Sequence, residues 1–272
     1  MTSLCHPIGL FDSGIGGLSV WRELSRLLPA ESTVYVADSA WCPYGPRPVQ
    51  DIVARTRQIT RFLLSQQCKL IVVACNTASA AALRLLRQEF NVPFVGLEPA
   101  IKPAAQATQT GHVGVLATTG TLQGQLFRQT SRRFAHGINL HVQVGEGLVE
   151  QIETGNLQSP QIEHLLRTYL NPMLAAGTDQ IVLGCTHYPL VMPLINRVVN
   201  GQARVLDPAL PVARQTQRVL HQRNLLCVDT VNPKHRFFTT GSGFCFQLPP
   251  AELQTSSAQT KSRSIWFESV QI

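Results

Sequence analysis

Two segments of the chain share one plan, and that plan decides the fold. They are Ile71–Thr77, which reads IVVACNT, and Ile181–His187, which reads IVLGCTH, and they begin 110 residues apart. Each starts with small or apolar residues without polar alternation, which is typical of a strand covered on both faces of a parallel sheet. Each then passes through a cysteine and a polar pair toward a helical pattern. The repeat predicts two similar α/β lobes whose cysteine loops face each other across a cleft.

Outside these segments, apolar runs that predict strands alternate with amphipathic stretches that predict helices. The predicted strands are Ile8–Phe11, Thr33–Ala37, Leu70–Ala74, Phe94–Gly96, Val113–Ala117, Leu140–Val144, Gln180–Gly184 and Arg204–Leu206. The predicted helices are Leu18–Leu28, Val49–Gln67, Ala78–Phe90, Thr121–Phe134, Ser159–Ala176 and Val191–Asn200. This alternation indicates mainly parallel, doubly wound α/β sheets with right-handed crossovers. Ligands of such folds bind at the carboxyl ends of the strands.

Beyond Cys227 the pattern weakens. Phe237–Gly241 predicts a strand and a turn, and the dipeptide Pro249-Pro250 breaks the chain's regular pattern after it. The segment Gln254–Ser264 is polar and rich in Ser, Thr and Gln. We predict no regular structure there.

The composition excludes several classes of protein. The chain has 272 residues and a formal charge of +7, and 44% of its residues are hydrophobic, which excludes a fully disordered chain. Only 14% of the residues are charged, so the pI near 9.3 reflects few acids rather than many bases. No basic run or aromatic-interleaved basic stripe occurs, and we expect no nucleic-acid partner. The longest apolar runs are far shorter than a membrane span, and we expect no membrane partner.

The seven cysteines are odd in number and widely spaced, at positions 5, 42, 68, 75, 185, 227 and 245. They include no Cys-x-x-Cys pair and no Cys/His quartet with zinc spacing, so the sequence predicts no metal site. The first residues, Met1–Pro7, lack the basic and apolar regions of a secretory signal. We therefore expect reduced thiols in a cytoplasmic protein.

The two cysteines of the repeat are the candidates for chemistry. A cysteine that closes a buried strand is most often a small core residue, but Cys75 precedes the cap-type residues Asn76 and Thr77. A thiol at a helix N-terminus has its thiolate form stabilised by unpaired N–H groups and the helix dipole. Cys185 has the same setting, and His187 follows it two residues later. A thiol, a hydroxyl and an imidazole at one strand end can act as an acid–base unit.

Two further polar loops follow predicted strands. Phe11–Gly17 (FDSGIGG) is a glycine-rich strand-to-helix turn without the spacing of a dinucleotide loop. It places Asp12 and Ser13 at a carboxyl strand end, where bare backbone N–H groups can hold a carboxylate. The loop Asp38–Gly45 follows the second strand, and its proline and glycine can set a rigid turn that presents Tyr44.

Together these segments resemble those of the glutamate racemases, within the aspartate/glutamate racemase superfamily. The matching segments, in family order, are Phe11–Leu18 (FDSGIGGL), Pro43–Gly45 (PYG), Ala74–Ser79 (ACNTAS), Glu98–Ala104 (EPAIKPA), Leu183–Leu190 (LGCTHYPL) and Phe238–Gly241 (FTTG). The resemblance implies two pseudo-symmetric α/β lobes with the active site in the cleft between them. It also implies interconversion of L- and D-glutamate without cofactor or metal, a supply of D-glutamate for bacterial peptidoglycan, and a homodimer.

The same resemblance implies the site residues. Cys75 and Cys185 are the implied catalytic pair. The implied acid–base groups beside them are Asp12 and His187. The residues implied to line the glutamate site are Asp12, Ser13, Tyr44, Gly45, Asn76, Thr77, Thr186 and His187. Two further family carboxylates match Asp38 and Glu150, as possible auxiliary groups. We expect the first lobe to comprise residues 1–98 and 208–272, and the second lobe residues 99–207.

The implied chemistry suits two opposed thiols. Racemisation removes a proton from one face of Cα and returns one to the other face. Reacting atoms lie about 3–3.5 Å apart in a near-attack geometry, so the sulfurs should be roughly 6–8 Å apart. A disulfide between them would abolish activity. Hydrogen-bond donors around the substrate carboxylate would stabilise the carbanion, and the expected donors are Ser13, Asn76, Thr77 and Thr186.

Two alternatives to a glutamate racemase stay open. One is an aspartate racemase or a related isomerase with the same two cysteines, although the PYG loop and the FDSGIGG turn favour glutamate. The other is a non-catalytic, basic binding module that contacts nucleic acid, which predicts salt-sensitive DNA binding and indifference to replacement of Cys75.

Overall fold

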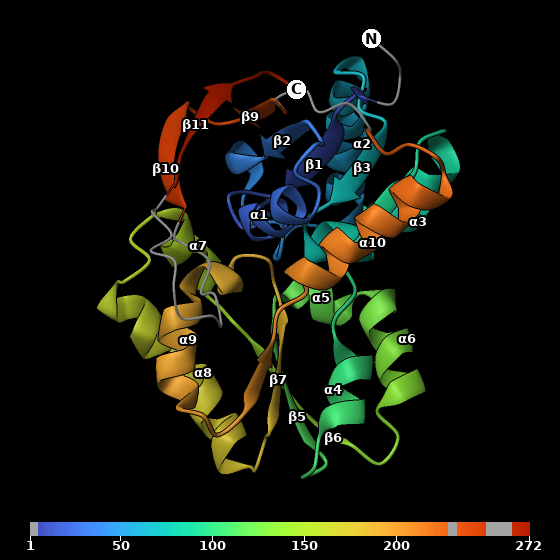
Figure 1. Ribbon diagram of the computed structural model, residues 1–272. Helices are drawn as coiled ribbons and strands as arrows, with labels where there is room; N and C mark the ends of the chain where they lie inside the picture. The colour runs from blue at the N-terminus through green and yellow to red at the C-terminus, as the bar shows by residue number, and fades with distance from the viewer. Residues whose placement is uncertain (1–4, 228–232, 249–262) are drawn as a thin grey trace.

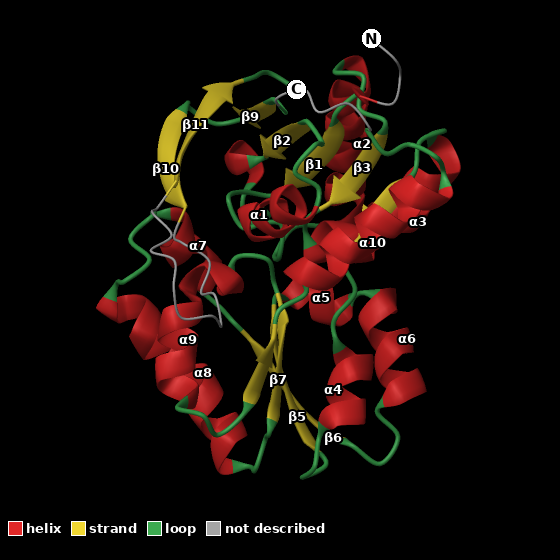
Figure 2. Ribbon diagram, in the orientation of Figure 1, coloured by secondary structure: helices red, strands yellow, loops and turns green. Residues whose placement is uncertain are grey.

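The computed structural model describes residues 5–227, 233–248 and 263–272. The dipeptide Pro249-Pro250 and most of the polar segment Gln254–Ser264 lie outside these residues. Within them the chain forms two α/β lobes with mainly parallel sheets, one above the other in Figure 1. Figure 2 shows how helices flank both sheets.

In the described part of the chain, a seven-stranded sheet with the order β10-β11-β9-β2-β1-β3-β4 defines the first lobe. Its strands are β1 (Ile8–Asp12), β2 (Thr33–Ala37), β3 (Leu70–Val73), β4 (Phe94–Gly96), β9 (His235–Thr239), β10 (Phe244–Leu248) and β11 (Arg263–Ser269). Every neighbouring pair is parallel except β10 and β11. All residues of β1, β2 and β3 are buried. Their unbroken apolar character therefore reflects cover on both faces.

Helices supply that cover on the first lobe. The helices α1 (Leu18–Leu27) and α10 (Ala209–Gln222) pack against each other. Their buried side chains join the same hydrophobic core as Leu10 and Val72 of the sheet. The helices α2 (Val49–Ser65) and α3 (Asn76–Glu89) also pack together, in a separate core with Phe11 and Val73. Since neighbouring residues of a strand point to opposite faces, the two cores occupy the two faces of the sheet.

A four-stranded, all-parallel sheet with the order β6-β5-β7-β8 defines the second lobe, as far as the described residues show. Its strands are β5 (His112–Ala117), β6 (Asn139–Val144), β7 (Gln180–Gly184) and β8 (Arg204–Leu206). Helices α8 (Pro160–Ala175) and α9 (Met192–Val199) lie on one side of this sheet in Figure 1, and α4 (Ile101–Ala107) and α6 (Gln125–Phe134) lie on the other. The short helices α5 (Thr119–Gln123) and α7 (Leu148–Glu153) lie toward the first lobe.

The eight strands predicted before residue 227 are all present, and none of their ends is shifted by more than one residue. The strand predicted within Phe237–Gly241 is β9, which begins two residues earlier. The predicted helix Thr121–Phe134 is instead two helices, α5 and α6, because Gly124 between them has extended backbone angles. The helices α4, α7 and α10 and the strands β10 and β11 were not predicted. Pro208 and Pro211 are residues that usually interrupt a helix. Here they lie at the N-terminus of α10, where backbone N–H groups have no partner within the helix and the N–H that proline lacks is not needed.

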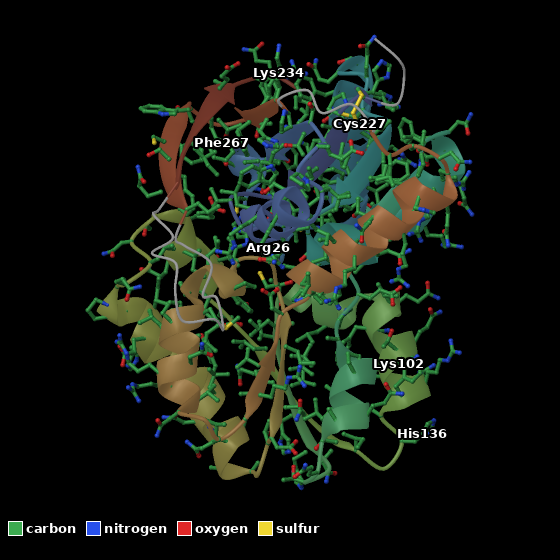
Figure 3. The ribbon with its side chains drawn as sticks, viewed as in Figure 1. Arg26, Lys102, His136, Cys227, Lys234 and Phe267 are labelled. Atoms are coloured by element: carbon green, nitrogen blue, oxygen red, sulfur yellow. A yellow bond between two sulfur atoms is a disulfide. The ribbon has the colours of Figure 1, made fainter. Side chains whose placement is uncertain are left out.

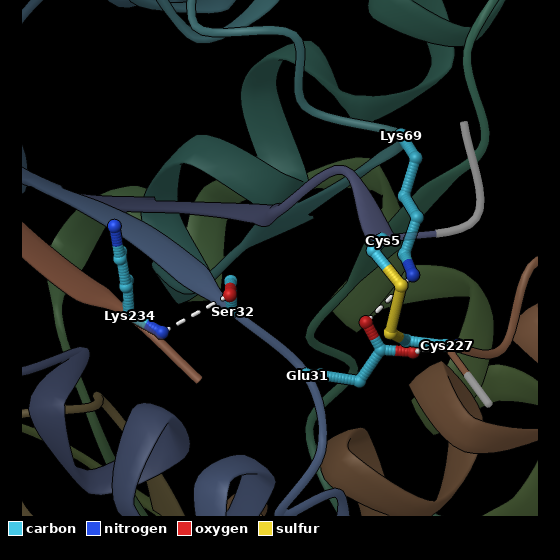
Figure 4. The surroundings of a disulfide bond; sticks show 6 residues. All are labelled: Cys5, Glu31, Ser32, Lys69, Cys227 and Lys234. Carbon is cyan, nitrogen blue, oxygen red and sulfur yellow. Dashed lines mark hydrogen bonds and ion pairs between the residues drawn. A yellow bond between two sulfur atoms is a disulfide. The ribbon is translucent and has the colours of Figure 1, made fainter. Parts of the chain in front are cut away.

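A disulfide joins Cys5 and Cys227, whose Cα atoms lie 4.9 Å apart although 222 residues separate them in sequence. Figure 3 shows Cys227 at the end of the first lobe that faces away from the second. Figure 4 shows the bond beside the buried ion pair of Lys69 and Glu31, with 2.6 Å between Nζ and Oε2. The expectation of reduced thiols is therefore wrong for this pair. Sequence spacing cannot reveal it, because the segment before β1 meets the end of α10 only in the folded chain.

The other five cysteines are free in the regions that the structure describes. Across the same regions, no helix combines the length and the apolar character that crossing a membrane requires.

Candidate active site

The two cysteines of the repeat occupy equivalent places in the two lobes and line one cavity. Cys75 follows β3 and caps α3, where its Sγ accepts a hydrogen bond from the N–H of Ala78 at 3.5 Å. Cys185 follows β7. Each residue is 4% exposed, and both line one small cavity. The cavity lies at the carboxyl ends of strands from both sheets, where α/β folds bind ligands.

The cavity brings together most of the residues that the sequence predicted. Those that line it are Ser13, Tyr44, Gly45, Cys75, Asn76, Thr77, Cys185, Thr186 and His187. Pro43, Thr118 and Val149 also line it and were not among the predicted residues. Asp12 and Asp38 are fully buried behind this lining.

Thr118 extends the site from the second lobe. It follows β5 and caps α5, and its Oγ1 accepts a hydrogen bond from the N–H of Thr121 at 3.3 Å. The same oxygen lies 2.8 Å from Oγ1 of Thr77, so the two hydroxyls join the lobes beside the cavity. The available signal was a threonine directly after a predicted strand, in the position that Cys75 and Cys185 hold relative to theirs.

Asn76 presents a buried side-chain amide to the cavity. It is 3% exposed and lines the cavity. Neither its side-chain oxygen nor its side-chain nitrogen has a hydrogen-bond partner among the described residues. A buried polar group without a partner costs free energy of about 1–3 kcal/mol. A polar ligand in the cavity would supply the partners for this amide.

Asp12, at the end of β1, accepts hydrogen bonds through both carboxylate oxygens. The N–H of Ser13 donates to Oδ1 at 2.6 Å, and the N–H of Gly17 donates to Oδ2 at 2.6 Å. The hydroxyl of Thr186, from the second lobe, donates to Oδ2 at 3.1 Å. Burial raises the pKa of Asp12 above its usual value, while a hydrogen bond with Cys75 works against this rise. A carboxyl group of this kind can exchange a proton with the neighbouring thiol.

Burial also decides the charge state of Cys75. It raises the pKa of the thiol well above the usual value, and the negative charge of Asp12 raises it further. The N–H of Ala78 lowers this pKa but does not outweigh burial. The helix N-terminus thus favours the thiolate as expected, but burial of this residue has the larger effect on its pKa. Deprotonation of Cys75 needs a proton acceptor, and Asp12 is placed to be one.

His187 sits between Cys185 and an acidic residue, Glu153. Its Nδ1 lies 3.8 Å from Sγ of Cys185, and its Nε2 lies 2.5 Å from Oε1 of Glu153. Burial by itself would lower the pKa of His187. Hydrogen bonds to Cys185, Cys42 and Glu153, with the charge of Glu153, instead raise it well above the usual value. A histidine held in this way can exchange a proton with a neighbouring group.

Glu153, not Glu150, is the carboxylate that the fold brings to this site. Glu150 is exposed in the first turn of α7, whereas Glu153, one turn later, contacts His187. Burial raises the pKa of Glu153, but its hydrogen bond with His187 and the histidine charge lower it below the usual value overall. Residues three apart share a helix face only roughly, and Leu148, Val149 and Ile152 occupy the buried side of α7. The prediction for Glu150 is therefore corrected to Glu153.

The glycine-rich turn of the first lobe is shaped by these two residues of the second. A Cβ at Gly14 would collide with the carboxylate of Glu153, and a Cβ at Gly16 would collide with the ring of His187. The N–H of Ile15 donates to Oε1 of Glu153 at 2.8 Å. The turn therefore contacts Glu153 and His187 of the opposite lobe directly, and its glycines leave the space that these side chains occupy.

Asp38 anchors the loop that presents Tyr44. The hydroxyl of Tyr44 donates to its Oδ2 at 2.5 Å, and the hydroxyl of Thr240 donates to its Oδ1 at 2.7 Å. The guanidinium of Arg55, on α2, makes an ion pair with it at 2.7 Å, and the side chains of both partners are nearly fully buried. Asp38 therefore holds the cavity wall in place without lining the cavity.

The site thus has two thiols, one from each lobe, with separate ionisable side chains beside each. Cys75 has Asp12, and Cys185 has the pair of His187 and Glu153. Such an arrangement can take a proton from a carbon atom held between the sulfurs and return one from the other side. A cavity rimmed by hydroxyls and backbone N–H groups also suits a carboxylate.

Comparison with known proteins identifies the class. The chain belongs to the Asp/Glu/Hydantoin racemase family, whose sequence model matches residues 8–216. Within that family it is similar to glutamate racemases. The glutamate racemase of Roseiflexus sp. (strain RS-1) is 48% identical over 238 residues, which cover 87% of this chain and 88% of that protein.

Two solved structures agree with this similarity. Escherichia coli glutamate racemase, in complex with L-glutamate and the activator UDP-MurNAc-ala, has a TM-score of 0.78 and 34% identity. The match covers 87% of this chain and 90% of that one. Francisella tularensis glutamate racemase, in complex with D-glutamate, has a TM-score of 0.75 and 29% identity, over 88% of this chain and 89% of that one.

Proposed function

We propose that the protein is a glutamate racemase that interconverts L- and D-glutamate with two thiols and no cofactor. The observation that carries this proposal is that Cys75 and Cys185, one from each lobe, line the same small cavity as free cysteines. The unpartnered amide of Asn76 supports a polar substrate in that cavity. The similarity to glutamate racemases over most of the chain supports glutamate as that substrate.

In the proposed mechanism, the substrate α-carbon lies between the two sulfurs. One sulfur, as thiolate, takes the Cα proton, and the other, as thiol, donates its proton to the opposite face. The electron pair left by the first transfer is spread into the substrate carboxylate. Hydrogen bonds from Ser13, Asn76, Thr77 and Thr186 stabilise the added negative charge.

Each thiol is served by its own neighbour. The raised pKa of His187 supports a ring that exchanges a proton with its neighbour Cys185 during turnover. The raised pKa of Asp12 supports a carboxyl group that takes up the Cys75 proton when Cys75 must act as the base. Glu153 orients His187 through its 2.5 Å contact, and Asp38 positions Tyr44.

The test is racemisation by the variants Cys75→Ala and Cys185→Ala. Both should lose turnover in both directions, measured by circular dichroism and by exchange of the Cα hydrogen in heavy water. Cys245→Ala is the control, because that thiol is exposed and outside the cavity. Near-normal turnover in either active-site variant would refute the two-thiol mechanism. Faster turnover of aspartate than of glutamate by the unmodified protein would refute the substrate.

The remaining parts of the proposal rest on the resemblance. The D-glutamate product would serve bacterial peptidoglycan synthesis, the enzyme would work in the cytoplasm, and it would be a homodimer. Free catalytic thiols fit a reducing compartment, whereas the Cys5–Cys227 disulfide does not. Alkylation of the protein in freshly lysed cells, followed by intact-mass measurement, would show whether Cys5 and Cys227 are reduced or joined in the cell. Sedimentation would give the oligomeric state.

The lobe bounds belong to the same proposal. We place the exchange between lobes near residues 98 and 208, so that residues 1–98 and 208–272 form the first lobe and 99–207 the second. The membership of β1–β4 and β9–β11 in one sheet, and of β5–β8 in the other, supports this division.

A further inference from the structure

Three side chains with metal-binding atoms, one of them His187, meet next to the cavity. A ring nitrogen of His187, Sγ of Cys42 and a carboxylate oxygen of Glu153 all lie within 4.8 Å of one another. They come from separate parts of the chain: the segment after the short 3₁₀ helix η2 (Ser39–Trp41), the end of α7 and the loop after β7. We propose that these three side chains form a binding site for a soft divalent cation such as Zn²⁺, which inhibits the enzyme by occupying His187.

The donor set has the chemistry of a zinc site. One thiolate sulfur, one imidazole nitrogen and one carboxylate oxygen are the three ligand types that Zn²⁺ prefers, and a water molecule can complete a tetrahedron. Bonds of about 2.0–2.3 Å to the metal put ligand atoms roughly 3.3–3.6 Å apart. Nε2 of His187 and Oε1 of Glu153, now 2.5 Å apart, would separate by about 1 Å. The other pairs would close by about the same amount at most.

Groups that orient the ligands are already in place. The N–H of Ile15 donates to Oε1 of Glu153 at 2.8 Å and fixes the carboxylate. The second ring nitrogen of His187, Nδ1, lies 3.8 Å from Sγ of Cys185. A metal-bound histidine usually gives its other N–H to an acceptor, and the Cys185 sulfur is available for this.

Two of the three side chains are partly exposed to solvent. The side chain of Glu153 is 19% exposed and Cys42 is partly exposed, whereas the side chain of His187 is 2% exposed. Neither Cys42 nor Glu153 lines the cavity, while His187 does. His187 is therefore the one residue that the cavity and this three-ligand cluster share.

Binding changes what the imidazole can do. Cys42 gives up its thiol proton and Nε2 of His187 gives up its proton to solvent, while the carboxylate of Glu153 has none to lose. The remaining ring proton stays on Nδ1 and points at Cys185. Because Nε2 is then held by the cation, the ring can no longer become an imidazolium. The predicted inhibition rests on the proposed racemase function, but the binding itself does not.

The test measures binding to the full chain without substrate. Cd²⁺ serves as the first probe, because its bond to a thiolate gives an ultraviolet charge-transfer band, and Zn²⁺ is then titrated by calorimetry. We expect one cation per chain. The variant Cys42→Ser should lose the band and bind Zn²⁺ more than about 100-fold more weakly. Loss of a residue that only hydrogen-bonds to a metal ligand already lowers metal affinity by about 10–100-fold, and loss of a ligand itself should lower it further. Glu153→Gln should weaken Zn²⁺ binding in the same direction.

Matched variants separate this site from the other thiols. Cys245→Ser removes an exposed thiol and Cys75→Ser removes a cavity thiol, and both should keep the band and the affinity. A band that survives in Cys42→Ser, or disappears in Cys75→Ser, would place the cation elsewhere and overturn the proposal. If cation binding fails while glutamate is racemised, only this inference falls. If racemisation fails while Cys42-dependent binding persists, only the proposed function falls.

Discussion

Nε2 of His187 lies 2.5 Å from Oε1 of Glu153, and this contact couples the charge of the histidine to the acidic residue at the end of α7. The histidine ring is buried, while Glu153 is partly exposed. The carboxylate therefore connects a buried acid–base group with the edge of the site. The same contact explains why Gly14 and Gly16 of the opposite lobe carry no side chain.

The first prediction concerns Glu153→Gln. Removing the negative charge removes one cause of the raised pKa of His187, so the imidazolium should persist only to a lower pH. The alkaline limb of kcat/KM should therefore move to lower pH. Because general acid–base groups contribute about 10²–10⁴-fold, the maximum should fall at least about tenfold. An unmoved alkaline limb with a lower maximum would mean that Glu153 has only a structural role.

The same variant should also change how the free energy of unfolding depends on pH. The raised pKa of His187 contributes stability that is fully present below its ordinary pKa and is lost as pH rises through the raised value. The lowered pKa of Glu153 contributes stability above its ordinary value, which is lost as pH falls through the lowered one. The free energies of unfolding of the unmodified protein and Glu153→Gln should therefore differ most at pH values between the ordinary pKa of glutamate and the ordinary pKa of histidine. Urea unfolding across pH gives the measurement.

The second prediction concerns Gly16→Ala. The added Cβ would collide with the ring of His187, whose far side is held by Glu153, so the ring must shift. A displacement of about 1 Å at a catalytic group can cost about 10²-fold in rate, and we expect a loss of kcat of that size. Gly241→Ala is the matched control, because its Cβ would make only ordinary contacts, the nearest at 3.4 Å. Equal activity in the two variants would contradict this account of the turn.

The third prediction separates binding from stability at Asn76. The variant Asn76→Ala removes two buried polar atoms that lack partners, so the substrate-free protein should be no less stable, while KM should rise at least about tenfold. Ser79→Ala, on the same helix, is the contrast. The hydroxyl of Ser79 donates to the carbonyl of Val73 at 3.1 Å and accepts from the N–H of Leu97 at 3.0 Å. That variant should lose stability. Thermal unfolding without substrate, together with steady-state kinetics, distinguishes the two.

Strands and cysteine loops could be predicted because the physics that forms them is local. A run such as Leu70–Val73 is apolar throughout because both faces are covered, and that signal marks its ends to within a residue. The pairing of the two cysteine loops follows, since the carboxyl ends of parallel strands share one edge. The shared plan of residues around Cys75 and Cys185 within this one chain was enough to predict their common cavity.

The rest of the site depends on distant contacts that no spacing encodes. Cys42, Glu153 and His187 come from three segments, and the choice between Glu150 and Glu153 depends on which side of α7 faces the first lobe. The helix N-terminus beside Cys75 was a correct local feature. Its effect on the thiol could not be weighed without knowing that burial is nearly complete.

The last prediction uses two arginines of α2 to separate a buried ion pair from an exposed one. Arg55 pairs with Asp38, whose side chain is fully buried, and Arg57 pairs with Glu89, where both side chains are about one-third exposed. Arg55→Met leaves the charge of Asp38 buried with only hydroxyl partners, so the free energy of unfolding should fall by about 3–5 kcal/mol. Arg57→Met should change it little, because water and salt already screen that pair.

Urea unfolding of both variants, at low and at high salt, checks this difference. The cost of Arg55→Met should persist at high salt, because solvent ions do not reach Asp38. KM should also rise in this variant, since Tyr44 lines the cavity and is held by Asp38. Equal losses of stability in the two variants would mean that the buried pair does not anchor the wall of the cavity.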